Sequence, residues 1–290
     1  MTPLILSILA STCIFVVFKL FDRFKIHTLQ AIVVNYITAC ITGFIAFNGS
    51  PTVESITTAP WFIYTLGLGI LFITVFNLMA ITTQRSGLSV VSVATKMSVV
   101  IPIIFGLVYY RESLGIFKTL GILMALVAVY LTSSKGKGSA SLGMKQWLLP
   151  ALVFLGSGII DTSIKFLEDA FVSENDVPVF SATIFGAAAS VGILTLLYLK
   201  LRGKVTFELK NVIGGIALGI PNYFSIYFLV KALRSGLFQS SGIFTVNNVS
   251  IVMLSTLVGI LLFRERILLK NWLGIFLAVV SIFLVALGQL

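Results

Sequence analysis

Charged side chains are scarce in this sequence: Asp, Glu, Lys and Arg together make up 10% of its 290 residues. Soluble globular domains carry about 25% charged residues. Apolar residues reach 58% and the mean hydropathy is +1.09, which is more apolar surface than one soluble core of this length can bury. The scarcity of charge therefore argues against a soluble fold and indicates a chain that lies in a lipid bilayer.

Cysteine and histidine are almost absent, and this argues against several kinds of site. The two cysteines, Cys13 and Cys40, fall inside apolar runs, so a disulfide framework is not expected. The single His27 has no histidine, cysteine or carboxylate cluster beside it, and a metal site needs several such ligands. We expect neither a metal nor a cofactor.

Acidic residues are also few, and the net charge is +10. The basic residues stand at the edges of apolar runs, where they anchor membrane helices, and they form no continuous polar face for a nucleic acid.

The N-terminus lacks the charged start and cleavage site of a signal peptide. We expect a monomer in a bacterial cell membrane whose partners are the lipid bilayer and a small-molecule substrate, with no nucleic acid.

Long apolar runs, by contrast, are abundant. A helix needs about 20 residues to cross the hydrocarbon layer. Segments of this kind cover residues 3–21, 29–48, 61–83, 88–109, 115–132, 147–167, 178–199, 211–232, 237–262 and 270–288. The sequence therefore predicts an all-α membrane protein with ten transmembrane helices.

Two motifs and one pair of residues recur in the two halves of the chain. Arg85-Ser86-Gly87-Leu88 recurs as Arg234-Ser235-Gly236-Leu237, Arg111-Glu112 with Leu120-Gly121-Ile122 recurs as Arg264-Glu265 with Leu273-Gly274-Ile275, and Ser11 with Lys19 recurs as Ser157 with Lys165. Three matches at equivalent places favour a duplication. They predict a first five-helix repeat at 1–132, a flexible polar linker at 133–146 and a second repeat at 147–290.

An odd number of helices in each half makes the second repeat enter the membrane from the opposite side. Inverted repeats of this kind are a recurrent design of secondary transporters, so the sequence predicts a transporter that works by alternating access. A channel-like or lipid-handling protein of the same fold is the alternative. An intramembrane enzyme is disfavoured, because no paired membrane carboxylates, His-Glu-x-x-His helix or Ser–His combination occurs.

Five residues carry a resemblance to a known family: Pro102, Glu112 and Gly121, with Glu265 and Gly274 in the second half. Together with the five-plus-five pattern they resemble the drug/metabolite transporter superfamily, EamA type, over essentially the whole chain. The resemblance implies export of metabolites, amino acids or drugs through a cavity lined by helices 1, 3, 4, 6, 8 and 9. One departure is Ser255, which stands where the second half would repeat Pro102.

Lys96 lies in the middle of the segment 88–109. A charge at the centre of a bilayer costs about 3 kcal/mol on insertion scales, so an ionisable group there indicates a functional site. We favour a cation that meets an anionic or carboxylate-bearing substrate. A lysine paired with a carboxylate or with helix carbonyls for architecture alone is the alternative.

Asp161 is the one carboxylate of ten that lies well inside an apolar run. It is a candidate proton carrier, because burial favours the protonated form of a carboxylate. Lys165 follows four residues later on the same helix face, so a local Asp161–Lys165 ion pair is an equal alternative. A pair between Asp161 and Lys96 is a third.

Amides inside the apolar segments are further candidates for substrate binding. Asn247 and Asn248 lie at the middle of the ninth segment, near the repeat position of Lys96, and either bind substrate or bridge helices. Weaker candidates are Asn77, Asn222 and Tyr223, whereas Asn35 is expected to serve helix packing. Gly214, Gly215 and Gly219 predict close helix contacts.

The distribution of basic residues predicts the orientation. With the N-terminus outside, 14 Lys and Arg residues lie on the cytoplasmic side and five on the other, and cytoplasmic loops are the more basic ones. The resemblance implies the opposite, with both termini in the cytoplasm. We follow the charge count and predict both termini outside.

Overall fold

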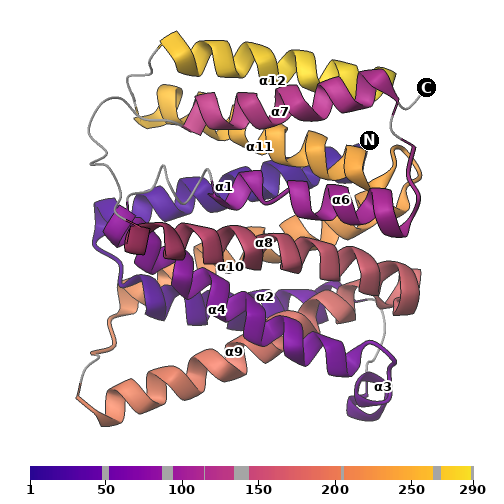
Figure 1. Cartoon of the computed structure of the whole chain (residues 1–290). Helices are drawn as coiled ribbons and strands as arrows, with labels where there is room; N and C mark the ends of the chain where they lie inside the picture. Colours follow the sequence, from indigo (N-terminus) through magenta and orange to yellow (C-terminus); the bar gives the residue numbers. More distant parts are fainter. Residues whose placement is uncertain are drawn as a thin grey trace. The chain divides into compact units, whose positions relative to one another are not determined.

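The computed structural model describes residues 1–47, 52–86, 94–113, 115–133, 144–203, 206–263 and 269–288, and within them it contains helices and turns but no strand. The long helices are α1 (Thr2–Phe24), α2 (Thr28–Ala46), α4 (Phe62–Ser86), α6 (Val100–Tyr109), α7 (Ile116–Ser133), α8 (Met144–Phe171), α9 (Val177–Leu201), α10 (Leu209–Arg234), α11 (Ser240–Phe263) and α12 (Leu269–Leu287) (Figure 1). Two short elements, α3 (Val53–Thr57) and the 3-10 helix η1 (Glu174–Asp176), lie in connections between them.

Seven of the described helices are long and apolar enough to cross a membrane. Three shorter apolar helices, Ala94–Tyr109, Ile116–Leu131 and Trp272–Leu287, fall in the remaining predicted segments. Large apolar side chains stand exposed along the long helices, for example Ile45 of α2, Leu194 of α9 and Leu261 of α11, as lipid contact requires. The all-α membrane fold is confirmed, whereas the number of ten crossings and the inverted repeats stay predictions.

The chain forms two compact units. Unit 1 comprises Met1–Ile8, Leu78–Thr162 and Ala232–Leu290, and unit 2 comprises Leu9–Asn77 and Ser163–Lys231. Unit 1 therefore contains α6 and α7 from the first half of the sequence with α11 and α12 from the second. Unit 2 likewise combines α2 with α9. Each unit draws helices from both of the proposed repeats.

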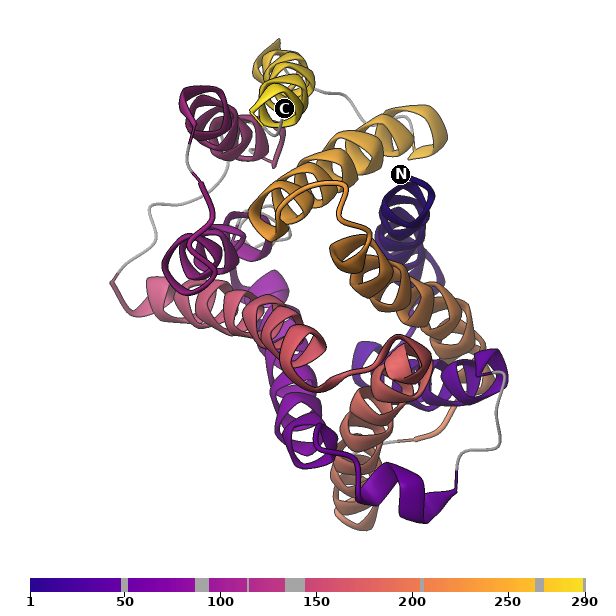
Figure 2. The same cartoon turned by 90° about the vertical axis from the view of Figure 1, so that its right-hand side faces the viewer.

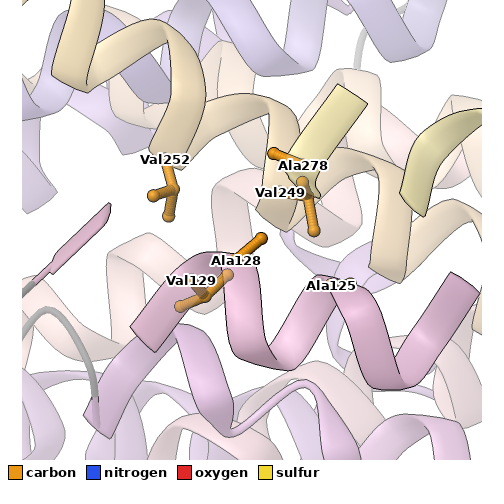
Figure 3. Close-up of a cluster of buried hydrophobic side chains, with 6 residues drawn as sticks. All are labelled: Ala125, Ala128, Val129, Val249, Val252 and Ala278. Carbon is orange, nitrogen blue, oxygen red and sulfur yellow. The ribbon is translucent and has the colours of Figure 1, made fainter. Parts of the chain in front are cut away.

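In unit 1 the helices α7 and α12 run side by side, as both views show (Figures 1 and 2). Gly121 permits this close approach: a Cβ added there would lie 2.8 Å from Val285 Cγ2 and 3.0 Å from the Ser281 carbonyl oxygen. Helix α11 packs on the pair through a buried cluster made of Ala125, Ala128, Val129, Val249, Val252 and Ala278 (Figure 3). The cluster fixes α11 against both neighbours.

In unit 2 the helix α10 packs closely on α2 at its glycines. A Cβ added at Gly219 would lie 2.6 Å from the Asn35 carbonyl oxygen, and one at Gly215 would lie 2.8 Å from the Ala31 carbonyl oxygen. One at Gly214 would lie 2.7 Å from Ile26 Cδ1, in the turn that precedes α2. The close helix contacts predicted for these glycines are confirmed. Small residues at such positions let two backbones approach each other in a membrane, where no hydrophobic effect drives helices together.

Candidate functional site

The helix that carries Lys96 is interrupted directly after it. Residues 94–97 are helical, Ser98 and Val99 form a turn, and α6 begins at Val100. The cause is Pro102, which has no N–H to donate to the Ser98 carbonyl. That carbonyl accepts instead from the Ile101 N–H at 2.9 Å. The sequence predicted one continuous helix here, and the structure shows a local distortion at Ser98 and Val99 within the apolar helix Ala94–Tyr109.

Lys96 is almost fully buried, with 7% of its surface exposed. Its ammonium group donates to Asn248 Oδ1 of α11 at 3.2 Å. The amide of Asn248 is oriented in turn, because its Nδ2 donates to the Phe244 carbonyl at 3.1 Å. A buried ammonium needs such partners, since its desolvation is otherwise costly.

Asp161 of α8 belongs to the same group. Helix α8 lies against the start of α6 at Gly158, where an added Cβ would clash with the side chain of Ile101 and lie 2.7 Å from its Cβ. Asp161 follows Gly158 by three residues and therefore shares its face. The carboxylate of Asp161 and the ammonium of Lys96 interact electrostatically. Unit 1 thus brings together an ammonium, an amide and a carboxylate from three segments of the chain.

Asn247, which precedes Asn248 on α11, is a further buried polar residue. The residue is 5% exposed, and its Oδ1 has no hydrogen-bond partner among the described residues. Buried amide oxygens are rarely left without a partner. This oxygen is therefore a candidate acceptor for a hydrogen bond from a bound solute.

Apolar packing holds these amides in place. Val249 and Val252 follow them on α11 and belong to the buried cluster with α7 and α12 (Figure 3). Met97 beside Lys96 packs against the same cluster. The two chain segments that carry the polar groups are therefore anchored to one core.

The other predicted residues, Asn77, Lys165, Asn222 and Tyr223, belong to unit 2. Asn77 donates to the Ile73 carbonyl at 2.8 Å, and Asn222 donates to Asn35 Oδ1 at 3.1 Å, which links α10 to α2. Tyr223 is fully buried. Lys165 forms ion pairs with Glu168 at 3.1 Å and Asp169 at 3.7 Å. A substrate-binding role for these residues stays a prediction.

The sequence predicts that Glu112 is a charge at a helix end. In the structure its carboxylate also contacts two other helices, α7 and α11. Its carboxylate accepts from the hydroxyls of Ser240 and Ser241 and from the Ser241 N–H at 3.3 Å, and it lies 3.4 Å from Lys118 Nζ, whose side chain is fully buried. Burial by itself raises the pKa of Glu112. The serine hydrogen bonds and the Lys118 charge outweigh burial, so this pKa lies below its usual value.

Such partners could not be found from spacing, because Ser240 and Ser241 lie 128 and 129 residues from Glu112 along the chain. The second-half counterpart, Arg264 with Glu265, lies outside the described residues.

Apolar spanning helices with buried ionisable groups among them are typical of polytopic membrane transport proteins. The profile of the EamA-like transporter family matches residues 1–134. An uncharacterized protein of Haemophilus influenzae is 30% identical over 288 residues, which cover 98% of this chain and 97% of that protein. The chain belongs to the EamA-like transporter family and is a multi-pass membrane transporter.

A solved structure, described only as the crystal structure of a protein, has the same fold. Its TM-score is 0.78 at 13% identity, and the match covers 99% of this chain and 96% of the other. At this level of identity the likeness concerns the fold alone.

Proposed function

We propose that this transporter is a secondary active carrier of the bacterial cell membrane that exports a small metabolite, amino acid or drug-like solute. The observation that carries the proposal is the buried Lys96, bonded to Asn248 and facing Asp161 beside a helix break. Placing two opposite charges at this depth costs several kcal/mol on insertion scales. Packing alone does not need them, because apolar side chains would fill the same space at no such cost.

Each group has a role in this proposal. Lys96 binds a carboxylate or another anionic group of the solute, and Asn247 and Asn248 orient it by hydrogen bonds. Asp161 carries the coupling proton. The charge of Asp161 changes how strongly it attracts the Lys96 ammonium, so the protonation of Asp161 and the binding of an anionic solute at Lys96 influence each other.

Alternating access follows from the proposed inverted repeats. Two repeats that exchange conformations open a central site first to one side and then to the other. A channel-like protein of the same fold would instead conduct without saturation.

Lys96→Ala tests the binding role. In reconstituted vesicles screened with a metabolite panel, we expect the variant to lose saturable transport while inserting and melting like the wild type. Lys231→Ala is the matched control, because Lys231 is a cation of α10 that lies over the Tyr227 ring in unit 2. Unchanged transport kinetics in Lys96→Ala would exclude the proposed role. Flux that does not saturate would favour a channel.

Asp161→Asn tests the coupling role. The amide cannot release a proton, so we expect transport that no longer changes between acidic and neutral pH. Transport should also no longer be driven by a pH gradient across the vesicle membrane. A variant that keeps the wild-type pH dependence would remove Asp161 as the proton carrier.

A further inference from the structure

A carboxylate in unit 1 joins the turn after α6 to the start of α11. The Glu112 carboxylate accepts from the hydroxyls of Ser240 and Ser241 and from the Ser241 N–H at 3.3 Å. Only 7% of the Glu112 side chain is exposed, so these hydrogen bonds are shielded from competing water. The two segments that carry the proposed binding groups, residues 94–109 and α11, are therefore fastened together at this end.

Lys118 of α7 completes the network from the other side. Its side chain is fully buried, and its ammonium donates to the Ser113 carbonyl at 3.1 Å and to the Gln239 amide oxygen. It also lies 3.4 Å from Glu112. Most hydrogen bonds of the network thus involve a charged group, which makes them stronger than bonds between neutral groups.

The backbone directs Glu112 into this network. Arg111 has a φ of 51°, a left-handed conformation that is uncommon for a residue with a Cβ. The chain thereby turns back, and the Glu112 N–H donates to the Gly106 carbonyl at 3.3 Å. Gly106 leaves room for the carboxylate, since an added Cβ would lie 3.0 Å from Glu112 Oε1. Backbone in such conformations is concentrated at binding sites and switch regions, which favours a functional role for this turn.

The network lies on the same face of α11 as the two asparagines of the candidate site. Asn247 and Asn248 follow Ser240 and Ser241 by seven residues. Seven residues make two helical turns, or about 10 Å along the axis, and return to the same face. Thr245 lies between them on this face and is 1% exposed. The network therefore separates the candidate site from the end at which α11 begins.

We propose that Glu112, Ser240, Ser241 and Lys118 form a gate, which closes the candidate site to the side of the membrane at which α11 begins and opens when its hydrogen bonds break. This inference rests on the proposed carrier function, because a carrier needs a barrier that opens on one side at a time. A helix cap with a purely structural role would instead stay closed in every state of the protein.

The test measures how fast a charged, water-soluble maleimide labels a cysteine placed between the gate and the site. The reporter is Thr245→Cys in the full chain without Cys13 and Cys40, purified in a neutral detergent. We expect this cysteine to be labelled slowly. When Ser240→Ala/Ser241→Ala is added, labelling should be at least about tenfold faster, because two hydrogen bonds to a carboxylate are lost.

Two controls separate the opening of a gate from a general loosening of the fold. Ala128→Cys reports on the buried cluster of α7, α11 and α12, and the serine changes should not alter its labelling. The matched variant Ser255→Ala/Thr256→Ala removes two hydroxyls that donate to the Val252 carbonyl of the same helix. It should leave Thr245→Cys protected.

Unchanged labelling of Thr245→Cys in the double serine variant overturns the proposal. Equal acceleration at Ala128→Cys also overturns it, because it would indicate a loss of packing. If the double variant does not fold, Ser240→Ala and Ser241→Ala should each give a smaller acceleration, and none in either would again contradict the gate. The measurement needs no transported solute, so a failure here leaves the binding role of Lys96 standing, and Lys96→Ala tests that role separately.

Discussion

At the scale of single residues, Glu112 shows how one carboxylate joins three helices. It follows the end of α6, accepts hydrogen bonds at the start of α11 and faces Lys118 of α7. An anionic group at a helix N-terminus satisfies free N–H donors and interacts favourably with the helix dipole. Here the capping group comes from another helix, so it fixes the position of α11, which also carries Asn247 and Asn248.

Glu112→Ala should lower the free energy of unfolding by about 3 kcal/mol, because the fully buried Lys118 loses its charged partner. The double variant Glu112→Ala/Lys118→Met should recover part of this loss, since neither charge is then left alone. Denaturation in detergent of the wild type, Glu112→Ala, Lys118→Met and the double variant gives the coupling energy between the two residues. Losses that simply add would show that the pair does not interact.

The same group predicts a dependence of stability on pH. Burial raises the pKa of Glu112, but its serine hydrogen bonds and the Lys118 charge lower this pKa by more, so the folded pKa lies below the unfolded one. The contribution of Glu112 to stability is therefore present above its unfolded pKa and lost as the pH falls through its folded pKa. The difference in melting temperature between the wild type and Glu112→Ala should shrink in acid. A constant difference would contradict this.

At the scale of elements, Pro102 decides where the helix of Lys96 breaks. Pro102→Ala restores an N–H that can donate to the Ser98 carbonyl, and a continuous helix would move Lys96 relative to Asn248. A proline inside a helix costs about 3 kcal/mol, so we expect equal or higher stability. Transport should fall by about an order of magnitude, because the site loses its geometry. Pro150→Ala is the control, since Pro150 lies inside α8 without interrupting it. Equal transport in both variants would argue against a role for the break.

The packing of α7 on α12 can be tested with a pair of glycines. At Gly121 an added Cβ would lie 2.9 Å from the Val285 backbone nitrogen, whereas at Gly67 of α4 nothing lies within 4 Å. Gly121→Ala should therefore destabilise the protein by about 1–3 kcal/mol. Gly67→Ala should be neutral or stabilising by up to about 1 kcal/mol, because alanine is the better helix former. Thermal melting in detergent separates the two, and equal effects would contradict the packing argument.

At the scale of the whole molecule, the orientation in the membrane remains the clearest global prediction. In a background without Cys13 and Cys40, Thr2→Cys and Ser141→Cys place single thiols at the N-terminus and in the linker. The charge count predicts that an impermeant maleimide labels the first and not the second on intact cells. The reverse pattern would support the orientation implied by the resemblance.

The sequence was informative about the membrane segments and about which charges are unusual. Every predicted segment contains a described apolar helix, because hydropathy is a local property of about 20 residues. The break at Ser98 and Val99 was missed, although Pro102 was noticed, because a membrane helix often tolerates proline. The short helix α3 was missed as well, since its polar residues, such as its capping residue Thr52, carry no spanning signal.

Lys96 and Asp161 were singled out by the cost of burying charge, which depends only on the surrounding apolar run. Which partner each one meets is a different matter. Lys96 bonds to an amide 152 residues away, and Lys165 bonds to carboxylates three and four residues later. Composition and hydropathy thus determined the solvent, the helices and the candidate charges. Only the tertiary structure decided the pairs among them, because contacts between distant segments depend on how the helices pack.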